Sequence, residues 1–369
     1  MTRLYPLPAW RQAMRAAFAL VFVLCAVPAE AQSQSGGEST RQGRAASISS
    51  EVYVAPELKA ANTTKAERQA LTLLAGAPES TALQVAQDLA IVLGSSESVR
   101  LVPVVGREGP QNLLDLLYLP GIDLAITQTD VLAAVSRGEL ASVKAEQIAY
   151  IAKLYNSELH VIAHEGTGTL AELAGKKVNF GEPGSGSQYT ARRVLRALGI
   201  KVQEVNLSHA DAMVQLRRGE IAATVFIGGK PSPEAAALSA AGKLRLVPVA
   251  YVPGLEADYL PARITHADYP ELIGEGHSID TIAVGTVLVL FNWPHGDERY
   301  ERSLLFVESF FGRLEALRRS ARHGKWREMN VPAPVPGISQ FAPARDWIDR
   351  ERKALASDAM GKEKPSFGE

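Results

Sequence analysis

The sequence is almost free of cysteine. Its 369 residues contain one, Cys25, within an N-terminal segment that we expect to be removed. The remaining chain then offers no disulfide, no cysteine-ligated zinc site and no catalytic thiol. Leu24, which precedes Cys25, is not the small residue that lipid attachment favours, so a lipoprotein is not expected.

Excess charge and long apolar runs are lacking as well. The formal net charge of the whole chain is -1, which gives no electrostatic signature of a nucleic-acid-binding protein. Outside the N-terminus, no stretch approaches the roughly eighteen apolar residues that a transmembrane helix needs. The sequence therefore predicts no nucleic-acid partner and a protein that is not membrane-embedded.

The N-terminus has the pattern of a cleavable signal peptide. Three arginines within the first fifteen residues precede a short apolar run at 16–27, and Ala-Glu-Ala follows at 29–31. We therefore predict a signal peptide over 1–31 and export to the periplasm. Residues 32–65 are rich in Ser, Gln, Gly and Thr and are predicted to form a flexible leader, and 351–369 a disordered tail.

Between these ends, short apolar runs alternate with amphipathic segments. Segments 81–93 and 188–198 have helical periodicity, and the alternation predicts an α/β fold with βαβ units and largely parallel sheets. A chain of this length also exceeds the usual size of one core and favours two domains. The predicted strands are 70–74, 99–105, 122–127, 159–163, 177–180, 222–227 and 244–250.

Two motifs resemble enzyme signatures without meeting their structural requirements. Gly-Thr-Gly-Thr-Leu-Ala at 166–171 matches a dinucleotide fingerprint, but the helix that should follow it has barely two turns. His160 and His164 have the spacing of a zinc-binding helix, yet the apolar residues between them indicate a strand. We predict a protein that is not an enzyme and that uses neither cofactor nor metal.

The strongest candidate binding feature is the Gly-Ser-Gly-Ser turn at 184–187. It joins the strand at 177–180 to the helix at 188–198, and Ser187 is a plausible N-cap. Backbone N–H groups of Gly184 and Gly186, the Ser185 hydroxyl and the positive helix end could together receive a carboxylate. The alternative is a capped helix start with a flexible turn.

Polar residues also follow other predicted strands, where ligands bind in open α/β sheets. Gln128 and Asp130 end the strand at 122–127, although Asp130 could instead cap a helix starting at Val131. Turns at 76–81 and 106–112 contribute Ser80, Thr81 and Asn112. Each turn alone has ordinary turn chemistry; a shared cleft is the simplest common explanation.

Several blocks of sequence, in order, resemble the TAXI solute-binding subunits of tripartite ATP-independent periplasmic (TRAP) transporters. The resemblance covers about residues 70–349. The blocks are Asp-Leu-Ala-Ile-Thr-Gln-Thr-Asp-Val at 123–131, Leu-Tyr-Asn-Ser-Glu-Leu-His-Val at 154–161, Leu-Ala-Glu-Leu-Ala-Gly-Lys-Lys-Val at 170–178, Pro-Gly-Ser-Gly-Ser at 183–187, Ala-Arg-Arg-Val-Leu at 191–195 and Gly-Glu-Ile-Ala-Ala-Thr-Val-Phe-Ile-Gly-Gly-Lys-Pro at 219–231.

This resemblance implies a two-lobed type II periplasmic-binding-protein fold with crossover strands near 159–163 and 282–290. Lobe one would combine 66–158 with 284–350, and lobe two would span 159–283. A small solute, an organic acid or amino acid bearing a carboxylate, would be bound by hinge closure and delivered to membrane subunits for ion-gradient-driven uptake. The alternative is a sensor that serves a receptor kinase. The ligand-binding residues would be Ser80, Thr81, Asn112, Gln128, Asp130, Tyr155, Gly184, Ser185, Gly186 and Ser187.

The chain departs from the family pattern at two turns of lobe one. Residues 76–81 lack the usual Gly-Gly-x-Tyr element, and Arg107 and Glu108 stand where a Thr-Gly-Gly-like sequence is typical. Because both turns adjoin the expected ligand site, the family's typical substrates do not transfer directly to this chain.

Overall fold

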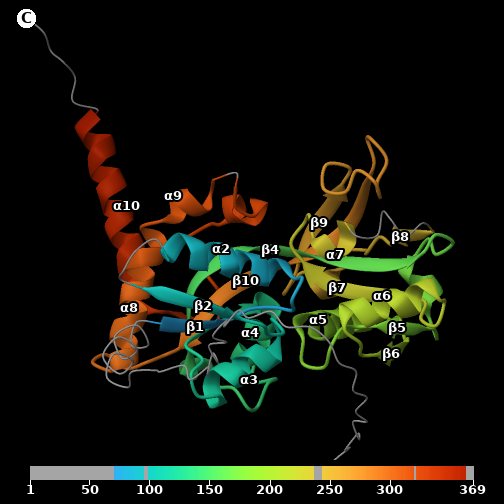
Figure 1. Ribbon diagram of the computed structural model, residues 1–369, viewed down its shortest axis with the longest axis horizontal. Helices are drawn as coiled ribbons and strands as arrows, with labels where there is room; N and C mark the ends of the chain where they lie inside the picture. Colours follow the sequence, from blue (N-terminus) through green and yellow to red (C-terminus); the bar gives the residue numbers. More distant parts are fainter. Residues whose placement is uncertain (1–69, 95–98, 237–242, 320, 363–369) are drawn as a thin grey trace, which may run out of the picture. The chain divides into compact units, whose positions relative to one another are not determined.

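A computed structural model describes residues 70–94, 99–236, 243–319 and 321–362, all within the compact unit Ala55–Glu369 (Figure 1). The predicted signal peptide and leader lie outside these residues. Within them, no helix is both long and apolar enough to cross a membrane.

In the described part of the chain, eleven strands form one continuous sheet, and two long strands connect its two halves. Eight strands follow the order β2-β1-β3-β10-β4-β7-β5-β6, while β11 and β8 pair with β4 and β9 pairs with β10. The strands are β1 Ala70–Leu74, β2 Arg100–Val104, β3 Leu124–Gln128, β4 Ile148–His164, β5 Lys177–Asn179, β6 Gln203–Val205, β7 Ala223–Gly228, β8 Leu244–Leu246, β9 Leu260–Thr265, β10 Ser278–Phe291 and β11 Ser339–Gln340.

The long strands β4 and β10 change partners along their length. The end of β10 pairs with β3 from Thr286 to Leu290, whereas its beginning pairs with β9 from Ser278 to Ala283. Similarly, β4 pairs with β11 near its start and with β7 from Glu158 onward. The fold is therefore a two-lobed α/β fold in which β4 and β10 pass from one lobe to the other, which confirms the predicted fold class.

The prediction of largely parallel sheets is wrong. Pairs β1–β2, β1–β3, β5–β6 and β5–β7 are parallel, but β10 is antiparallel to β3, β4 and β9, and β4 is antiparallel to β7 and β8. The short βαβ units produce the parallel pairs. The antiparallel pairs arise because β4 and β10 cross between the lobes in opposite directions.

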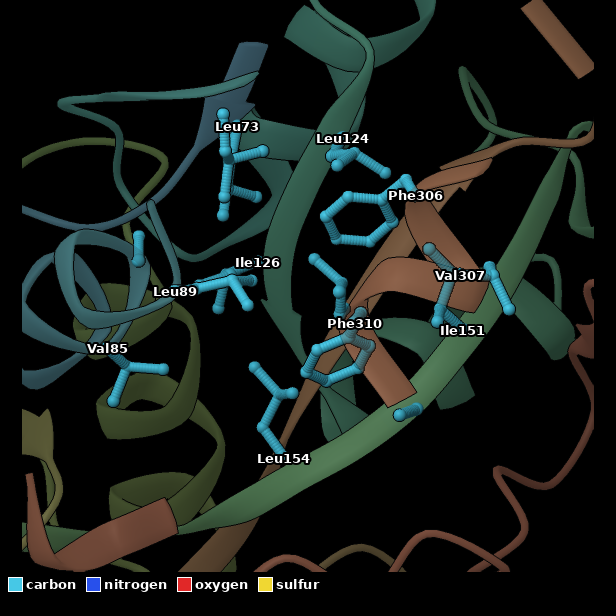
Figure 2. Close-up of a cluster of buried hydrophobic side chains, with 14 of the residues drawn as sticks. Leu73, Val85, Leu89, Leu124, Ile126, Ile151, Leu154, Phe306, Val307 and Phe310 are labelled. Carbon is cyan, nitrogen blue, oxygen red and sulfur yellow. The ribbon is translucent and has the colours of Figure 1, made fainter. Parts of the chain in front are cut away.

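In the first lobe, apolar side chains alternate between two cores on opposite faces of the sheet. Leu73, Ile126 and Ile151 belong to one core, and the adjacent Leu74, Ala125 and Tyr150 belong to the other. Figure 2 shows the first core, where Phe306 and Phe310 of α8 pack against these strands. The lobe's helices are α2 Thr81–Leu93, α3 Pro110–Tyr118, α4 Thr129–Ser136, α8 Glu298–Phe311, α9 Leu314–Leu317, α10 Ala342–Lys362 and the 3-10 helices η2 Ala145–Gln147 and η6 Gly324–Glu328.

The second lobe repeats this arrangement on its own cores. Val161, Val225 and Ile227 point to one face, whereas Ile162 and Phe226 point to the other. This period-2 alternation is what a sheet covered on both faces requires. Its helices are α5 Gly186–Ala197, α6 His209–Arg217, α7 Pro233–Ala236 and the 3-10 helices η3 Leu170–Leu173 and η5 Pro253–Leu255.

Two expectations about helices need correction. The cap of α5 is Ser185 rather than Ser187, because Ser185 Oγ accepts the Gln188 N–H at 3.1 Å. Residues 351–362, predicted as part of a disordered tail, are the last turns of α10. Strong helix formers such as Arg, Glu, Lys, Ala and Leu continue that helix beyond its packed part.

Candidate functional site

A cavity of about 320 Å³ lies between the two lobes. The first lobe contributes the turns after β1 and β2, and the second contributes the ends of β5 and β7 and the start of α6. The lining residues are Ala77, Pro78, Glu79, Ser80, Gly106, Arg107, Glu108, Asn179, Gly181, Glu182, Ser185, Ser187, Leu207, Ser208, His209, Ala210, Thr224, Val225, Phe226, Ile227 and Glu234.

The cavity lies where strand topology places ligand sites. Parallel strands β1 and β2 end at the same edge of the sheet, and the polar turns that follow them face the second lobe. On the other side, β5 and β7 are also parallel and supply Asn179 and Ile227. Carboxyl ends of strands from both lobes therefore enclose the same space.

Asn112 shapes this edge of the first lobe from within. The side chain is fully buried, and its Nδ2 donates to Ala75 O at 2.7 Å and to Ile126 O at 2.8 Å. Its Oδ1 accepts the Arg107 N–H at 2.7 Å. Asn112 thus ties the ends of β1 and β3 to the turn after β2, and it does not line the cavity.

Ser80 and Thr81 have different positions although they are adjacent. Ser80 lines the cavity and caps α2 by accepting the Leu83 N–H at 3.2 Å. Thr81 lies outside the cavity, where its Oγ1 accepts the Gly229 N–H at 3.1 Å and also lies 3.2 Å from Gly229 O. Thr81 therefore connects the first lobe to the second.

Most groups of the turn at 184–187 already have protein partners. The Gly184 N–H donates to Gln188 Oε1 at 2.9 Å, and the Gly186 N–H donates across the lobes to Arg107 O at 2.9 Å. Ser187 Oγ accepts the Ile227 N–H at 3.0 Å. Within the described part of the chain, this leaves the Ser187 N–H and the hydroxyl hydrogens of Ser185 and Ser187 as donors of this turn for a bound molecule.

Two glycines, Gly109 and Gly186, lie at close contacts between the lobes. A Cβ at Gly109 would lie 2.4 Å from the backbone nitrogen of Gly186, and a Cβ at Gly186 would lie 2.5 Å from Gln128 Nε2. Such distances exclude any side chain at Gly109 in this arrangement. Gly184 also takes part, since its carbonyl accepts the Gln111 N–H at 3.2 Å.

Gln128 and Asp130 belong to a separate buried contact between the lobes. Asp130 Oδ2 accepts from Thr190 Oγ1 at 2.7 Å and from Tyr259 OH at 2.8 Å. Burial raises the pKa of Asp130, and these hydrogen bonds oppose that increase. Helix α4 begins at Thr129 with Gln128 as N-cap, so the alternative of Asp130 as the cap is wrong.

Tyr155 is a buried residue of β4 and does not line the cavity. Its hydroxyl has no partner in hydrogen-bond geometry among the described residues. Burial raises the pKa of Tyr155 well above its usual value, and the nearby charge of Glu108 raises it further.

The cavity lining is rich in carboxylates. Glu108 and Glu234 are each 8% exposed, and Glu79 and Glu182 lie nearer the solvent. Burial, reinforced by Glu234, raises the pKa of Glu108 to about 8. Arg107 directs its guanidinium to Pro183 O at 2.9 Å, which uses one of its donors within the protein.

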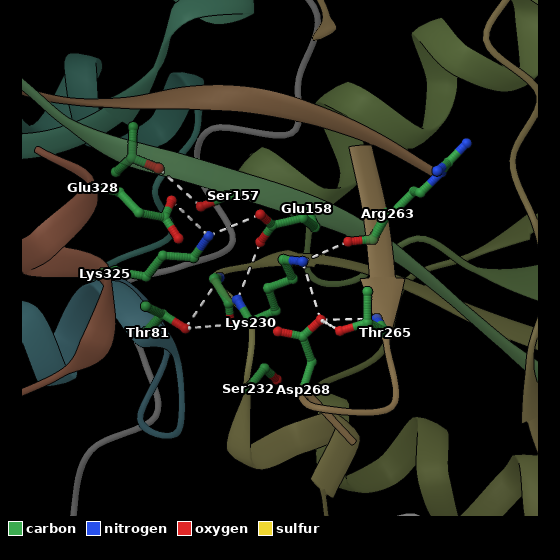
Figure 3. A network of polar contacts seen from close by, with 12 residues as sticks. Thr81, Ser157, Glu158, Lys230, Ser232, Arg263, Thr265, Asp268, Lys325 and Glu328 are labelled. Atoms are coloured by element: carbon green, nitrogen blue, oxygen red, sulfur yellow. Dashed lines mark hydrogen bonds and ion pairs between the residues drawn. The ribbon is translucent and has the colours of Figure 1, made fainter. Parts of the chain in front are cut away.

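A second polar region between the lobes is fully paired (Figure 3). Lys325 Nζ, which is buried, contacts Glu158 Oε1 at 2.7 Å and Glu328 Oε2 at 2.9 Å. Glu158 Oε2 accepts the Lys230 N–H at 3.0 Å, and Lys230 Nζ pairs with Asp268 at 3.0 Å. This network joins η6 of the first lobe to the crossing strand β4 and to the second lobe.

The candidate zinc pair does not form a metal site. His160 and His164 lie on strand β4, as predicted, and both ring nitrogens of His160 are hydrogen-bonded, to Glu158 O and to Tyr269 OH. Burial lowers the pKa of His160 to about 3. Nowhere in the described ranges do three or more His, Cys, Asp or Glu residues gather in a way that could hold a metal ion.

Of the ten predicted site residues, the structure brings Ser80, Ser185 and Ser187 to the cavity. The others lie in lobe contacts or in the core, and their role in binding stays a prediction. Sequence reasoning missed Phe226, His209 and Glu234. Phe226 reads as a core residue of an apolar strand, and no local pattern marks the other two.

The comparisons with known proteins concern the family and the fold. The NMT1-like family matches residues 74–301. A protein from Bordetella bronchiseptica RB50 has a TM-score of 0.50 at 12% identity, with 77% of this chain and 98% of that chain covered. That likeness supports a shared fold.

Two further solved structures show weaker likeness. A mutant of ArgBP from T. maritima has a TM-score of 0.43 at 16% identity and covers 71% of this chain and 93% of its own. The periplasmic aliphatic sulphonate binding protein SsuA from Escherichia coli has a TM-score of 0.40 at 19% identity, with coverages of 76% and 78%.

Proposed function

This chain belongs to the NMT1-like family, and from that premise we propose that it is an exported solute-binding protein that serves a membrane transporter. The observation that carries the proposal is the cavity of about 320 Å³ between two lobes. That volume suits a small organic molecule. Binding involves no chemical step.

The transporter we propose is of the TRAP type, with this chain as its TAXI-like subunit. Support comes from the ordered sequence blocks at 123–131, 154–161, 183–187 and 219–231, which lie on β3, β4, the α5 turn and β7. The predicted signal peptide at 1–31 supports a periplasmic location. Delivery to membrane subunits would then depend on an ion gradient.

The mechanism we propose is closure of the lobes on the solute, with lobe boundaries near 158/159 and 283/284. Contacts on several sides of the cavity support it, because Thr81 meets Gly229 and Arg107 meets Gly186 across the lobes. A carboxylate of the solute would accept the Ser187 N–H at the positive end of α5. Ser80 and Ser185 lie in the same lining.

Two experiments test this function. Native mass spectrometry of the exported protein should reveal a co-purified small molecule. The same molecule should stabilise the fold by about 2.7 kcal/mol at a hundredfold excess over its Kd. Stabilisation by nucleotides or metal ions alone would contradict the binding role.

A transport assay tests the finer assignment. Vesicles that contain the cognate membrane subunits should accumulate the labelled solute only with this protein and an imposed ion gradient. Uptake that requires ATP and ignores the gradient would contradict the TRAP assignment while leaving solute binding intact.

A further inference from the structure

The cavity lining carries more negative than positive charge. Glu79, Glu108, Glu182 and Glu234 line it, while its basic groups are Arg107 and His209. Burial lowers the pKa of His209, which therefore stays neutral at pH 7. Once Glu108 and Glu234 are ionised, a solute with a net negative charge would meet repulsion from this lining.

Glu108 is the most constrained of these carboxylates. It is 8% exposed and takes φ 55°, a left-handed conformation that is uncommon for residues other than glycine. Its Oε2 lies 2.5 Å from where a Cβ of Gly76 would be, so a glycine at that position makes room for the carboxylate. Within the described residues, Glu108 has no hydrogen bond or ion pair.

Among the described residues, no cationic side chain is paired with Glu108. Glu234 Oε2 accepts from Ser232 Oγ at 2.5 Å and raises the pKa of Glu108, after burial itself. The hydroxyl of Tyr155, also buried near Glu108, lies outside the cavity lining and beside the hydroxyls of Ser157 and Thr286. A largely buried carboxylate without a protein partner is destabilising once it is ionised, so a cationic ligand beside Glu108 would stabilise that form.

We infer that the solute carries a cationic nitrogen group, an ammonium or a guanidinium, that Glu108 binds in the cavity with Glu234 beside it. This inference rests on the proposed function and defines its substrate class: the solute is a zwitterion or a cation and not a net anion. The nitrogen donates charge-assisted hydrogen bonds to Glu108, and any carboxylate of the solute is bound by the Ser187 N–H.

Binding of such a group should release a proton at neutral pH. Unligated Glu108 is mostly protonated below its pKa of about 8, and a bound cation stabilises the ionised form. Affinity should therefore increase from pH 6 to pH 8 and then level off. The titratable and charged groups around Glu108 are Glu79, Arg107, Tyr155, Glu158, Glu182, His209 and Glu234.

The test uses the full exported chain and a panel of defined probes. The cationic and zwitterionic probes are L-arginine, L-lysine and putrescine, and the anionic probes are succinate and glutarate. At least one probe of the first set should raise Tm. Its calorimetric Kd should weaken at least tenfold in Glu108→Gln, as expected for a lost hydrogen bond to a charged group.

Calorimetry in phosphate and in Tris buffers measures the proton released on binding. The parent should release protons at pH 7, and Glu108→Gln should release markedly fewer. Glu271→Gln, which removes an exposed carboxylate of the second lobe, is the matched control and should bind like the parent.

The outcomes separate this inference from the proposed function. If only succinate or glutarate binds, with proton uptake, the function survives and the cationic class is wrong. If a cationic probe binds with equal affinity to Glu108→Gln and the parent, Glu108 is not its site and the inference fails. If no probe of either set binds, both the inference and the proposed function lose their support.

Discussion

Two buried glutamates between the lobes, Glu158 and Glu108, have opposite environments. Glu158 lies against the ammonium group of Lys325 and accepts the Lys230 N–H. Burial raises its pKa to about 7, and the positive charges of Lys325 and Lys230 oppose that increase. Glu108 has no such partner among the described residues, and its pKa is raised to about 8. The protein pairs Glu158 with a cation of its own, whereas we propose that a ligand supplies the cation for Glu108.

Buried polar groups at the boundary between the lobes thus have two different roles: Glu158 helps to hold the structure together, and Glu108 is available to a ligand. The Lys325 network joins η6 of the first lobe to the crossing strand β4 and to Lys230 and Asp268 of the second lobe (Figure 3). Glu108 instead lines a cavity that a small molecule can fill. Burial alone would not distinguish them, because both are less than a tenth exposed.

The largest expected effect on stability is at the ion pair between Lys325 and Glu158. Lys325→Met should lower the free energy of unfolding by about 3–5 kcal/mol at pH 8, because it leaves Glu158 buried without its cation. Urea denaturation measures the loss. Adding Glu158→Gln should recover part of it, while Arg263→Met, which breaks an exposed ion pair with Asp280, should change stability by less than about 0.5 kcal/mol.

At Glu108, which has no cationic partner, the effect of a substitution on the free energy of unfolding should have the opposite sign. Glu108→Gln should stabilise the unligated protein by about 1–3 kcal/mol at pH 9, because it removes an unsatisfied buried charge. The folded-state pKa of Glu108 is raised, so its ionisation costs stability increasingly from about pH 4.5 to 8 and the cost then levels off. The gain should therefore be small at pH 5. Equal effects at pH 5 and 9 would contradict an uncompensated Glu108.

Closure can be tested without touching either carboxylate. Gly109→Ala places a Cβ 2.4 Å from Gly186 N and from Ser185 C, so the lobes must separate to accommodate it. Affinity for the identified solute should decrease at least tenfold, about 1.4 kcal/mol, with little change in unligated stability. Gly166→Ala, whose Cβ meets nothing within 4 Å, is the control. Unchanged affinity in Gly109→Ala would contradict closure in this geometry.

The smallest expected effect concerns the cap of α5. Ser185→Ala removes the acceptor of the Gln188 N–H and should cost about 1 kcal/mol of folding stability, with little change in affinity. Thermal unfolding and calorimetry on one preparation measure both quantities. The exposed Ser142→Ala provides the baseline. A large loss of affinity with unchanged stability would show that Ser185 binds the ligand and does not act mainly as the cap of α5.

The sequence predicted the positions of the binding turns better than it predicted the roles of individual residues in them. It located the turns after β1, β2, β3 and β5 at one binding region, and the structure brings those after β1, β2 and β5 to the cavity, whereas Gln128 and Asp130 after β3 do not line it. It took Ser187 as the cap and Ser185 as a ligand group, whereas Ser185 caps the helix. A two-residue shift of a helix start reverses such roles, and the Gly-Ser repeat contains no local signal to set it.

The departure at Arg107 and Glu108 was the informative signal for the ligand. Turn residues are ordinarily polar and exposed, so the sequence could not indicate that Glu108 is buried, takes φ 55° and faces Glu234. Glu234 lies more than a hundred residues away, and only the meeting of the lobes brings the two carboxyl groups near each other.

The sequence by itself determined the α/β class and indicated two lobes, the short strands of the βαβ units and the helices at 81–93 and 188–198, because hydrophobic periodicity and capping residues act over a few neighbours. Helix 81–93 was predicted with its observed bounds. The antiparallel partners of β4 and β10, the glycine contact at Gly109 and the pairing of Glu158 with Lys325 depend on distant segments. Tertiary structure alone decided them, because burial and charge pairing are properties of the assembled lobes and not of any local run of residues.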